Sequence, residues 1–367
     1  MTGGPADRRT DADRGWSGTT RGAGSPAVRP STLVIQTAFL GDVVLTTPLL
    51  SRLAERDGPV DVVTTPAAAS LLEHHPAVHT VLGYDKHGSQ RGWRALRKIG
   101  TLLRARGYHR VVLPHQSLRS AVLALWSGAP ERIGFADSPA AISYTRRVRR
   151  ARQGHEVERL LALAGSSVGT APRVSLGLQP RDYSAADQWL AAHGVAPRFA
   201  ALAPGSIWGT KRWPYYAELA AALDRPSVIV GGVDDVPLAD SIVAAARGRA
   251  VSAAGALSLR SSAALIERAS VLVSNDSAPL HLATAVGTPV VALFGPTVPE
   301  FGFGPRGRDD AVLGLDDLAC RPCSSHGPQT CPLGHHRCMR DLSVDTVANA
   351  VATLASAEDS RAICPGN

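Results

Sequence analysis

Short apolar segments alternate with amphipathic segments along most of this chain. In the first half, the segments expected to form strands are residues 31–38, 60–65, 78–85, 108–115 and 131–135. The intervening segments carry leucine and alanine at helical spacing, at 66–75, 90–106, 117–128 and from Asp42 onward, where Gly41 allows a tight turn. Such alternation predicts a parallel sheet covered by helices.

The same alternation restarts in the second half. Strands are expected at 198–205, 227–232, 250–255, 271–276 and 289–295, with helices at 214–223, 234–246, 258–268 and 277–286. A segment containing Pro and Gly, about 165–183, indicates a linker. We therefore predict an α/β protein with two Rossmann-like domains, 31–170 and 184–355, facing one another across a cleft. Residues 1–30 are expected to form a disordered tail.

The charge of the chain is basic. Lys and Arg number 39 against 31 Asp and Glu, a net charge of +8, and part of the excess lies in the run Arg146–Arg152. A basic surface attracts nucleic acid, anionic lipid or a phosphorylated substrate, although it can also be simply a solvated face. No apolar stretch is long enough for a transmembrane helix, and the first 30 residues lack a secretory signal. A cytoplasmic protein with reduced cysteines is expected.

The segment VLVSNDSAPLHLATAVGTPVVALFGPT, residues 271–297, carries the strongest motif. A strand ending at Asn275 and Asp276 runs directly into a helix with Ser277 as N-cap. The N–H groups of Ser277 and Ala278 then point into the cleft, where the helix dipole favours a phosphate. The alternative is an ordinary junction between a strand and a helix.

Two further segments predict contacts with a nucleotide. PGSIWGTKRWP, residues 204–214, lacks the Walker order, but its Ser206, Thr210 and Lys211 can bind a diphosphate. GGVDD, residues 231–235, ends a strand, and an acidic residue there commonly accepts hydrogen bonds from a ribose. Asp234 and Asp235 both qualify, and either can instead cap the following helix.

Asp42 is the candidate catalytic residue of the first half. A carboxylate at a turn between strand and helix that faces the cleft can act as a general base, or it can only cap its helix. The D-x-D pattern at Asp11 and Asp13 lies in the tail, so no metal is expected at the diphosphate. Lys211 and the helix N-terminus must then stabilise the charge of the leaving group.

Four cysteines gather in CRPCSSHGPQTCPLGHHRC, at positions 320, 323, 331 and 338. The first pair has C-x-x-C spacing, and Cys320, Cys323, Cys331 and Cys338 together can build a structural zinc site. The second pair lacks the tight spacing of a zinc ribbon. Reduced cysteines in a packed loop and disulfide bonds therefore stay as alternatives.

Taken together, these motifs resemble those of glycosyltransferase family 9, the ADP-heptose lipopolysaccharide heptosyltransferases. The resemblance covers about residues 31–350, through TAFLGDVVLTTPLL, RSAVLALWSGAPERIGF, HEVERLLAL, PGSIWGTKRWP and the 271–297 segment. CPLGHHRCM resembles the heptosyltransferase II branch. The resemblance implies a GT-B fold and an inverting transfer of heptose from ADP-heptose, with no metal or other cofactor required for catalysis.

The resemblance also implies roles for single residues. Asp42 matches the catalytic base, Lys211 the lysine that contacts donor phosphate and sugar, and Asp276 a residue that contacts heptose hydroxyls. Ser206, Thr210, Ser277 and Ala278 match the phosphate site, and Asp234 or Asp235 matches the ribose contact. In the first domain, Arg119, His155 and the run Arg146–Arg152 are expected to meet acidic sugars or lipid phosphates of the acceptor.

The expected partners follow from this assignment. They are ADP-heptose and a glycan or lipid-linked acceptor such as the lipopolysaccharide core, with peripheral contact at the inner face of the cytoplasmic membrane and no nucleic acid. One alternative is transfer of another activated sugar to a small-molecule or cell-envelope acceptor. Two others are a sugar-nucleotide epimerase and a non-catalytic module that binds a nucleotide sugar or nucleic acid.

Overall fold

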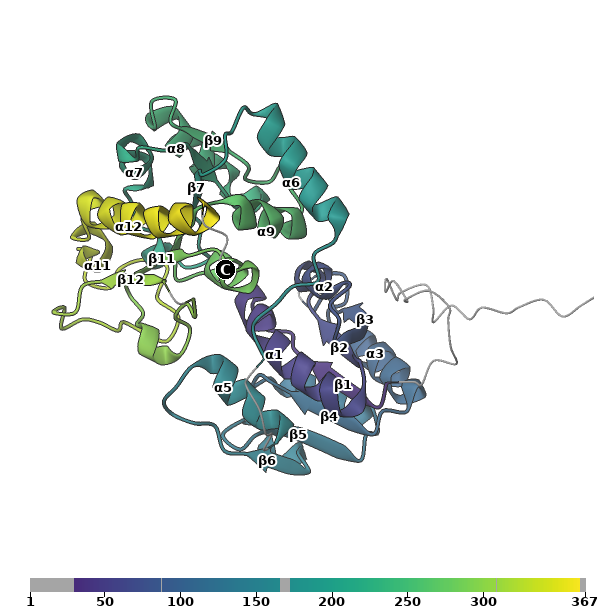
Figure 1. The fold of residues 1–367 in the computed structure, drawn as a ribbon. Coiled ribbons are helices and arrows are strands. Elements are labelled where there is room, and N and C mark those ends of the chain that lie inside the picture. The colour runs from purple at the N-terminus through teal and green to yellow at the C-terminus, as the bar shows by residue number, and fades with distance from the viewer. Residues whose placement is uncertain (1–29, 87, 166–171, 308, 364–367) are drawn as a thin grey trace, which may run out of the picture. The chain divides into compact units, whose positions relative to one another are not determined.

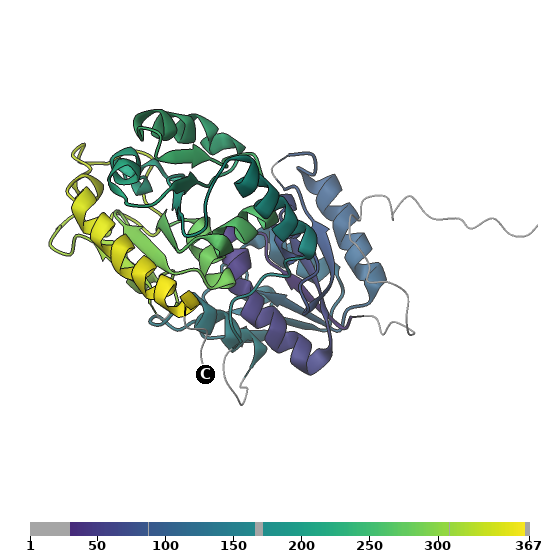
Figure 2. The same cartoon turned by 45° about the horizontal axis from the view of Figure 1, so that its top comes forward.

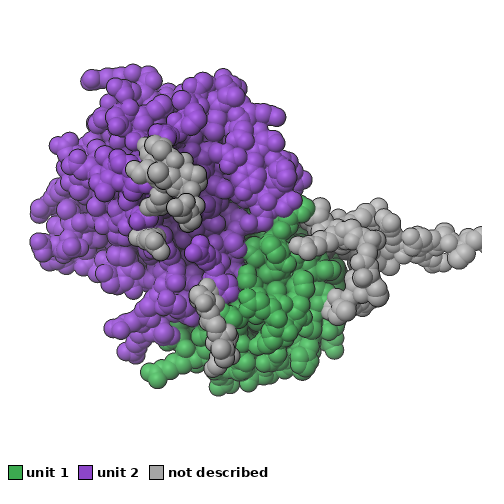
Figure 3. All heavy atoms as spheres, in the orientation of Figure 1, with its two compact units in different colours: residues 1–38, 49–150, 160–170 green, residues 39–48, 151–159, 171–367 purple. Residues whose placement is uncertain are grey.

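The computed structural model describes residues 30–86, 88–165, 172–307 and 309–363, with side chains up to residue 357. The expected tail, with Asp11 and Asp13, lies outside these residues except for Pro30. By its contacts the chain divides into two compact units, coloured in Figure 3. Unit 1 comprises Met1–Ala38, Leu49–Arg150 and Leu160–Thr170, and unit 2 comprises Phe39–Pro48, Ala151–Arg159 and Ala171–Asn367.

Unit 1 contains a six-stranded parallel sheet with the order β3-β2-β1-β4-β5-β6. Its strands are β1 (Thr32–Ile35), β2 (Val60–Thr64), β3 (Val78–Gly83), β4 (Arg110–Leu113), β5 (Glu131–Phe135) and β6 (Arg146–Val148). The first strand along the chain lies in the middle, between β2 and β4. Buried valine, leucine and isoleucine side chains fill β1, β2 and β4, as expected of strands covered on both faces.

Helices cover the sheet of unit 1, as Figure 1 shows. They are α1 (Leu40–Asp57), α2 (Pro66–Leu72), α3 (Trp93–Arg106), α4 (Leu118–Trp126) and α5 (Glu156–Leu161), with the short turns η2 (Ala141–Ser143) and η3 (Ala162–Ala164). The beginning of α1 and most of α5 belong to unit 2 by their contacts. On one face, α3 and α4 pack with Leu33, Ile35 and Val111 in a single hydrophobic core.

Unit 2 repeats this plan with the order β12-β11-β10-β7-β8-β9, again parallel throughout. Its strands are β7 (Ala200–Ala203), β8 (Ser227–Ile229), β9 (Ala250–Ser252), β10 (Val271–Asn275), β11 (Val290–Phe294) and β12 (Ala311–Gly314). Here β7 is the first strand of the sheet along the chain, and it pairs with β8 on one side and β10 on the other. After β7 the chain therefore forms β8 and β9 on one side of this strand, and it then crosses to the other side to form β10.

The helices of unit 2 are α6 (Pro180–Ala192), α7 (Tyr216–Ala222), α8 (Val236–Ala245), α9 (Leu259–Arg268), α10 (Ala278–Val286), α11 (Arg337–Arg340) and α12 (Val344–Ile363). Short turns lie at η4 (Gly209–Lys211), η5 (Val233–Asp235) and η6 (Pro299–Phe301). The yellow α12, which Figure 2 shows lengthwise, shares a core with α7 and α8 on one face of the sheet. No described helix combines the length and apolar character needed to cross a membrane.

Three elements differ from the sequence expectations. The basic run contains β6, in which Arg146 and Arg147 pair with β5. Part of the expected linker forms α6, because Pro180 fits the first turn and the Asp182 carboxylate accepts a hydrogen bond from the Gln179 N–H at 2.8 Å. The long C-terminal α12 was not predicted, since its small residues give a weak helical pattern.

His75 makes the stability of unit 1 sensitive to acid. Its side chain is buried, and burial lowers its pKa from 6.5 to about 4. The unfolded chain therefore binds a proton that the folded chain does not bind between these pH values. We expect this histidine to contribute about 3 kcal/mol to stability above pH 6.5, and this contribution is lost as the pH falls toward 4.

Urea unfolding at pH 7 and pH 4.5 measures this effect. His75→Asn keeps an acceptor for the Ala77 N–H, which donates to Nδ1 of His75 at 3.2 Å, but removes the titrating ring. The variant should lose less stability than the wild type on acidification, whereas substitution of the exposed His109 by Asn should change nothing. Equal losses in His75→Asn and wild type would contradict the assignment.

Candidate functional site

The candidate site lies beside β7 and β10, where the order of the strands in the sheet of unit 2 reverses. β7 and β10 are adjacent and parallel, with Ala203 opposite Ser274. The segments that follow these strands therefore emerge at the same edge of the sheet. Ligands of open α/β sheets bind at this position, beyond the carboxyl ends of the strands.

A buried ion pair joins the two segments. The Nζ atom of Lys211 lies 2.6 Å from Oδ2 of Asp276 and 3.1 Å from the Asp276 carbonyl oxygen. The hydroxyl of Thr297 donates to the same Oδ2 at 2.7 Å. Both charged side chains are about 10% exposed, so the pair is shielded from solvent without being sealed from it.

Asn275 fixes the geometry of these segments. Its side chain is fully buried, and its Nδ2 donates to the Pro204 carbonyl at 2.8 Å. Its Oδ1 accepts from the Trp213 N–H at 3.2 Å and from the Tyr216 hydroxyl at 3.3 Å. One amide therefore holds both ends of the 204–213 segment against β10, which places Lys211 beside Asp276.

The N-terminus of α10 follows immediately after Asp276. Ser277 is the N-cap residue, Ala278 is the first helical residue, and Pro279 fits the first turn because it needs no N–H acceptor there. In this described part of the chain, the Ser277 side chain makes no capping hydrogen bond to the helix. The first N–H groups of α10 are thus available to an anionic ligand, as at other helix N-termini.

The 204–213 segment also packs against the cysteine-rich segment. Thr210 is buried, and its hydroxyl and its N–H both donate to the Pro328 carbonyl. The His336 ring donates to the Thr210 carbonyl at 2.8 Å, and the Gln329 amide bonds both Gly209 and Ile207. Thr210 therefore holds the loop in place here, while the Ser206 hydroxyl oxygen accepts from the Trp208 N–H at 3.3 Å.

The two acidic candidates for the ribose contact differ in position. The Asp235 carboxylate accepts a hydrogen bond from the Gly232 N–H at 2.9 Å. It also lies so close to Gly205 that an added Cβ there would be 2.3 Å from Oδ1 of Asp235. Asp234 is exposed. The geometry therefore places Asp235, rather than Asp234, beside the 204–213 segment.

The turn that carries Asp42 belongs to unit 2 by its contacts. The Asp42 carboxylate accepts a hydrogen bond from the Phe39 N–H at 3.2 Å, so it caps the start of α1. A methyl group added at Gly41 would lie 2.6 Å from Cδ2 of His281 and 3.8 Å from Cα of Ala278. The Asp42 turn therefore packs directly on the first turn of α10.

His281 is a site residue that the sequence reasoning missed. It lies one helical turn after Ser277 and is 5% exposed. Burial lowers its pKa to about 4, so the ring is neutral at pH 7. Its Nδ1 is buried without a hydrogen-bond partner among the described residues. Its place in the capped-helix motif was the available signal.

Three aromatic rings connect the Asp42 turn with the 204–213 segment. His326, from the cysteine-rich segment, contacts Phe39 and Trp208 edge to face, at centroid distances of 6.2 and 6.1 Å. Phe39 is 48% exposed although it is a large apolar residue. Unit 2 therefore contains four segments of the candidate site: the Asp42 turn, the 204–213 segment, the start of α10 and the cysteine-rich segment.

The two candidate acceptor residues lie in different units. Arg119, on α4 of unit 1, is exposed and donates to the Lys86 carbonyl at 3.0 Å. His155 donates through Nε2 to the Gly304 carbonyl at 2.9 Å, and its Nδ1 accepts from the Val157 N–H at 3.1 Å. Burial lowers the pKa of His155. Both ring nitrogens of His155 are therefore occupied within the protein.

The basic run 146–152 is partly structural. The Arg146 guanidinium donates to the Leu163 carbonyl at 2.7 Å, and the Arg150 guanidinium lies 4.9 Å from the centre of the Phe135 ring. Arg147 and Arg149 are exposed. Arg152 is exposed as well. Two of the five arginines of the run therefore support the edge of the sheet, and three remain at the surface.

The cysteines lie near one another but do not form a metal cage as arranged. Burial raises the pKa of Cys338 to about 11, and the other three thiols act in the same direction. The thiol of Cys323 donates to the Cys320 carbonyl at 3.3 Å, and the His336 N–H donates to Cys331. Among the described residues, no group of three or more His, Cys, Asp or Glu could hold a metal ion. Structural zinc stays a prediction, which elemental analysis of the purified protein would test.

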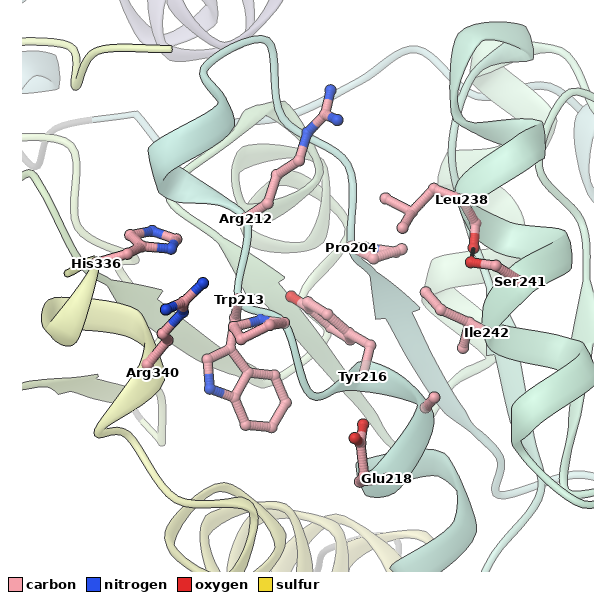
Figure 4. Close-up of a pocket in the computed structure, with 12 residues that line it drawn as sticks. Pro204, Arg212, Trp213, Tyr216, Glu218, Leu238, Ser241, Ile242, His336 and Arg340 are labelled. Atoms are coloured by element: carbon pink, nitrogen blue, oxygen red, sulfur yellow. Dashed lines mark hydrogen bonds between the residues drawn. The ribbon is translucent and has the colours of Figure 1, made fainter. Parts of the chain in front are cut away.

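A pocket of about 400 Å³ opens beside the 204–213 segment, as Figure 4 shows. Trp213 and Tyr216 form part of its wall, Leu238 and Ile242 project into it from α8, and His336 reaches it from the other side. None of the candidate donor-binding residues lines this pocket. The candidate site is therefore defined by the ion pair and the start of α10.

The family comparison covers most of the segments described above. The model of "Glycosyltransferase family 9 (heptosyltransferase)" matches residues 96–333, well over half of the chain. The chain belongs to glycosyltransferase family 9. The matched region includes Lys211, Asp235, Asp276 and the start of α10.

Curated relatives of this family 9 enzyme extend the likeness over most of its length. It is 29% identical to lipopolysaccharide heptosyltransferase 1 of Pseudomonas aeruginosa over 79% of this chain and 85% of the relative. It is 28% identical to lipopolysaccharide heptosyltransferase 2 of Escherichia coli, over 73% and 84% of the two chains. These relatives and the family match confirm the prediction of a glycosyltransferase.

Solved structures confirm the α/β, GT-B fold of the family 9 enzyme. A family 9 glycosyltransferase from Veillonella parvula has a TM-score of 0.79 at 23% identity, covering 91% of this chain and all of that one. E. coli ADP-heptose lps heptosyltransferase II has a TM-score of 0.74 at 24% identity, over 90% and 99%. E. coli heptosyltransferase WaaC with ADP-2-deoxy-2-fluoro heptose has a TM-score of 0.64 at 22% identity, over 88% and 99%.

The contact between Gly41 and His281 gives a prediction for this glycosyltransferase. In Gly41→Ala, the new methyl group would meet the His281 ring at 2.6 Å, so the buried ring or the turn that carries Asp42 must shift. A displacement near 1 Å of a reacting group can cost about 10²-fold in rate, and we expect a loss of that order in sugar transfer.

Steady-state kinetics of three variants test this prediction. His281→Ala combined with Gly41→Ala removes the clashing ring and should recover part of the activity relative to Gly41→Ala alone. His281→Ala measured by itself gives the baseline for that comparison. Wild-type kinetics in Gly41→Ala would show that the packing of this turn does not matter for the reaction.

Proposed function

We propose that this enzyme is an inverting, metal-independent heptosyltransferase that moves a heptose from ADP-heptose to a lipopolysaccharide-core or related glycan acceptor. The observation that carries the proposal is the shielded Lys211–Asp276 pair at the start of α10. A cation, a row of helix N–H groups and a carboxylate within one short segment suit a sugar joined to a diphosphate. The diphosphate takes the positive groups, and the sugar hydroxyls take the carboxylate.

The hydrogen-bond capacity of the ion pair leaves room for a donor. An ammonium group has three N–H donors, and within the described residues Lys211 uses two of them, on Asp276. The third N–H can bind a phosphate oxygen. The described contacts of the Asp276 carboxylate go to Oδ2, so Oδ1 can accept a hydroxyl of the heptose.

Asp42 is the proposed general base. An ionised aspartate can take the proton of the attacking hydroxyl. The acceptor oxygen bonds to the anomeric carbon as the bond from that carbon to the phosphate oxygen breaks. A single displacement of this kind inverts the anomeric carbon. The departing ADP carries the negative charge, which Lys211 and the N–H groups of Ser277 and Ala278 stabilise.

The relatives support the choice of donor and acceptor. Two curated relatives are named lipopolysaccharide heptosyltransferases, and one solved structure of similar fold holds ADP-2-deoxy-2-fluoro heptose. By position, Asp235 is the better candidate for the ribose contact, because its carboxylate adjoins Gly205. Ser206 remains a proposed phosphate contact, and Arg119 a proposed acceptor contact. Thr210 and His155 would need to exchange protein hydrogen bonds for substrate.

Incubation of the full chain with ADP-heptose and heptose-deficient lipopolysaccharide tests the proposal. The expected product is the acceptor with one heptosyl residue added and with the anomeric configuration opposite to that of the donor, determined by mass spectrometry and NMR. Added EDTA should leave the rate unchanged. Conversion of ADP-heptose without any acceptor would indicate an epimerase, and transfer only from another nucleotide sugar would refute the donor assignment.

A further inference from the structure

We propose that α3 and α4 of unit 1 form a docking surface for an anionic lipid bilayer. We define the α3–α4 surface by the exposed side chains of Trp93, Arg94, Arg97, Lys98, Leu118 and Leu125. The proposal deepens the proposed function, and it rests on that function only in expecting a lipid-linked acceptor.

The first observation is the charge of this part of the chain. Residues 86–130 contain nine Lys and Arg and no Asp or Glu. The flanking acidic residues are occupied: Asp85 accepts hydrogen bonds from Gly88 and Ser89, and Glu131 pairs with Arg110. A surface this one-sided is complementary to an anionic partner.

Most basic side chains of α3 take no part in ion pairs within the described residues. Arg94, Arg97, Lys98 and Arg104 form no ion pair among the described residues. By contrast, Arg106, the last residue of this helix, lies within ion-pair distance of Asp61. Arg110, which follows the helix, lies within ion-pair distance of Asp57 and Glu131. The exposed row is therefore available to a partner, while the arginines near the sheet stabilise the fold.

The second observation is apolar. All four large apolar side chains that unit 1 exposes within its described residues lie on α3, on α4 and on η2, whose Ala141 packs against the same core: Trp93, Leu118, Leu125 and Ile142. Leu118, Val122 and Leu125 follow one stripe of α4 at helical spacing, and Val122 is only half-buried. Exposed apolar side chains that gather on one face mark an interaction site more often than scattered ones do.

Trp93 is held at the surface by packing from below. Its ring lies 6.3 Å from that of the half-buried Trp126, which itself fills the space over Gly100 of α3. The indole of Trp93 nevertheless remains 71% exposed. A supported, exposed tryptophan next to arginine and lysine is typical of side chains that sit at the boundary between lipid headgroups and acyl chains.

A bilayer explains both observations better than a nucleic acid does. Phosphates of either partner would attract the arginines, but leucine and isoleucine side chains gain nothing from a phosphate backbone. An interfacial helix surface instead uses its apolar residues in the acyl boundary and its basic residues on the headgroups. The α3–α4 surface carries both kinds of exposed side chain on two helices that pack against each other.

Vesicle co-sedimentation of the full chain, without donor or acceptor, tests the proposal. Binding is expected to vesicles that contain phosphatidylglycerol, not to phosphatidylcholine alone, and should weaken in high salt. Arg97→Glu/Lys98→Glu should lower the partition coefficient about tenfold or more, and Trp93→Ser/Leu125→Ser should also lower it. The matched controls, Arg173→Glu/Arg181→Glu and Val312→Ser, change exposed residues of unit 2 and should bind as the wild type does.

A second measurement locates the contact. Brominated lipids should quench the fluorescence of the wild type, and Trp93→Phe should lose most of this quenching while it still binds. Absence of binding to anionic vesicles overturns the proposal. So does binding that is insensitive to Trp93 and Leu125 and is displaced by an oligonucleotide, because this would identify a general polyanion surface. Transfer to a detergent-dispersed acceptor should be unchanged in all these variants, so vesicle binding and heptose transfer can fail independently.

Discussion

Asp42→Asn should lower kcat for heptose transfer by about 10²–10⁴-fold, the usual contribution of a general base. The substitution is conservative in shape. The Asn side-chain oxygen can still accept the hydrogen bond that the Phe39 N–H now donates to the Asp42 carboxylate, so the start of α1 keeps its cap. What is lost is the proposed ability of this residue to take a proton from the attacking hydroxyl.

Kinetics and calorimetry together separate these two roles of Asp42. Affinity for ADP should stay within about twofold of wild type in Asp42→Asn, because the proposed donor contacts come from other segments. Asp42→Ala should lose the same activity and also some stability, since it removes the cap. A rate near that of the wild type in Asp42→Asn would show that Asp42 only caps its helix.

Lys211→Gln should lower kcat/KM for the donor by about 10²–10³-fold, because it removes a positive charge from the proposed position of the departing ADP. Glutamine is the appropriate replacement. Its amide can still donate a hydrogen bond to Asp276, which reduces the penalty of leaving that shielded carboxylate without a partner. The effect should therefore fall on the donor more than on folding.

The thermal midpoint and the affinity for ADP distinguish a binding role from a structural one. Lys211→Met leaves Asp276 unpaired and should destabilise the protein, by up to about 3–5 kcal/mol if the pair behaves as a buried one. Adding Asp276→Asn to that variant should recover stability but not donor use. Unchanged donor kinetics in a folded Lys211→Gln would exclude the proposed phosphate contact.

The strand and helix pattern was sufficient to predict two parallel sheets, because apolar runs such as Leu33–Ile35 are typical of strands covered on both faces. The pattern did not predict a strand where the side chains lack the apolar character that is typical of strands. β6 is only three residues long and two of them are arginines, so its pairing with β5 depends on the sheet already being present. Tertiary context, not local propensity, decides such edge strands.

Most residues of the candidate site were singled out from the sequence, but their contacts with one another were not. Lys211 and Asp276 were singled out from separate motifs, yet their pairing follows from the adjacency of β7 and β10, and strand order cannot be seen in a single sequence. Thr210 shows the same limit. Its hydroxyl bonds the Pro328 carbonyl, 118 positions away in the chain.

His281 was overlooked for a different reason. A single histidine on an apolar helix is usually a core residue, and nothing in its spacing distinguishes it from one. Its contact with Gly41, from a segment far away in the sequence, connects it with Asp42. The choice between Asp234 and Asp235 also needed coordinates, because it depends on which carboxylate turns toward Gly205.

The hydrogen bonds of Asn275 limit which amino-acid substitutions this region can accept during evolution. Its two side-chain atoms satisfy a main-chain carbonyl, a main-chain amide and a phenol at once, in a volume closed to water. Aspartate would set a charge against the Pro204 carbonyl, serine would be too short to span the gap, and an aliphatic residue would leave three polar groups unsatisfied. Substitution of Asn275 should therefore be tolerated very rarely. The exposed Asp234, two residues after Gly232, should tolerate substitution far more easily.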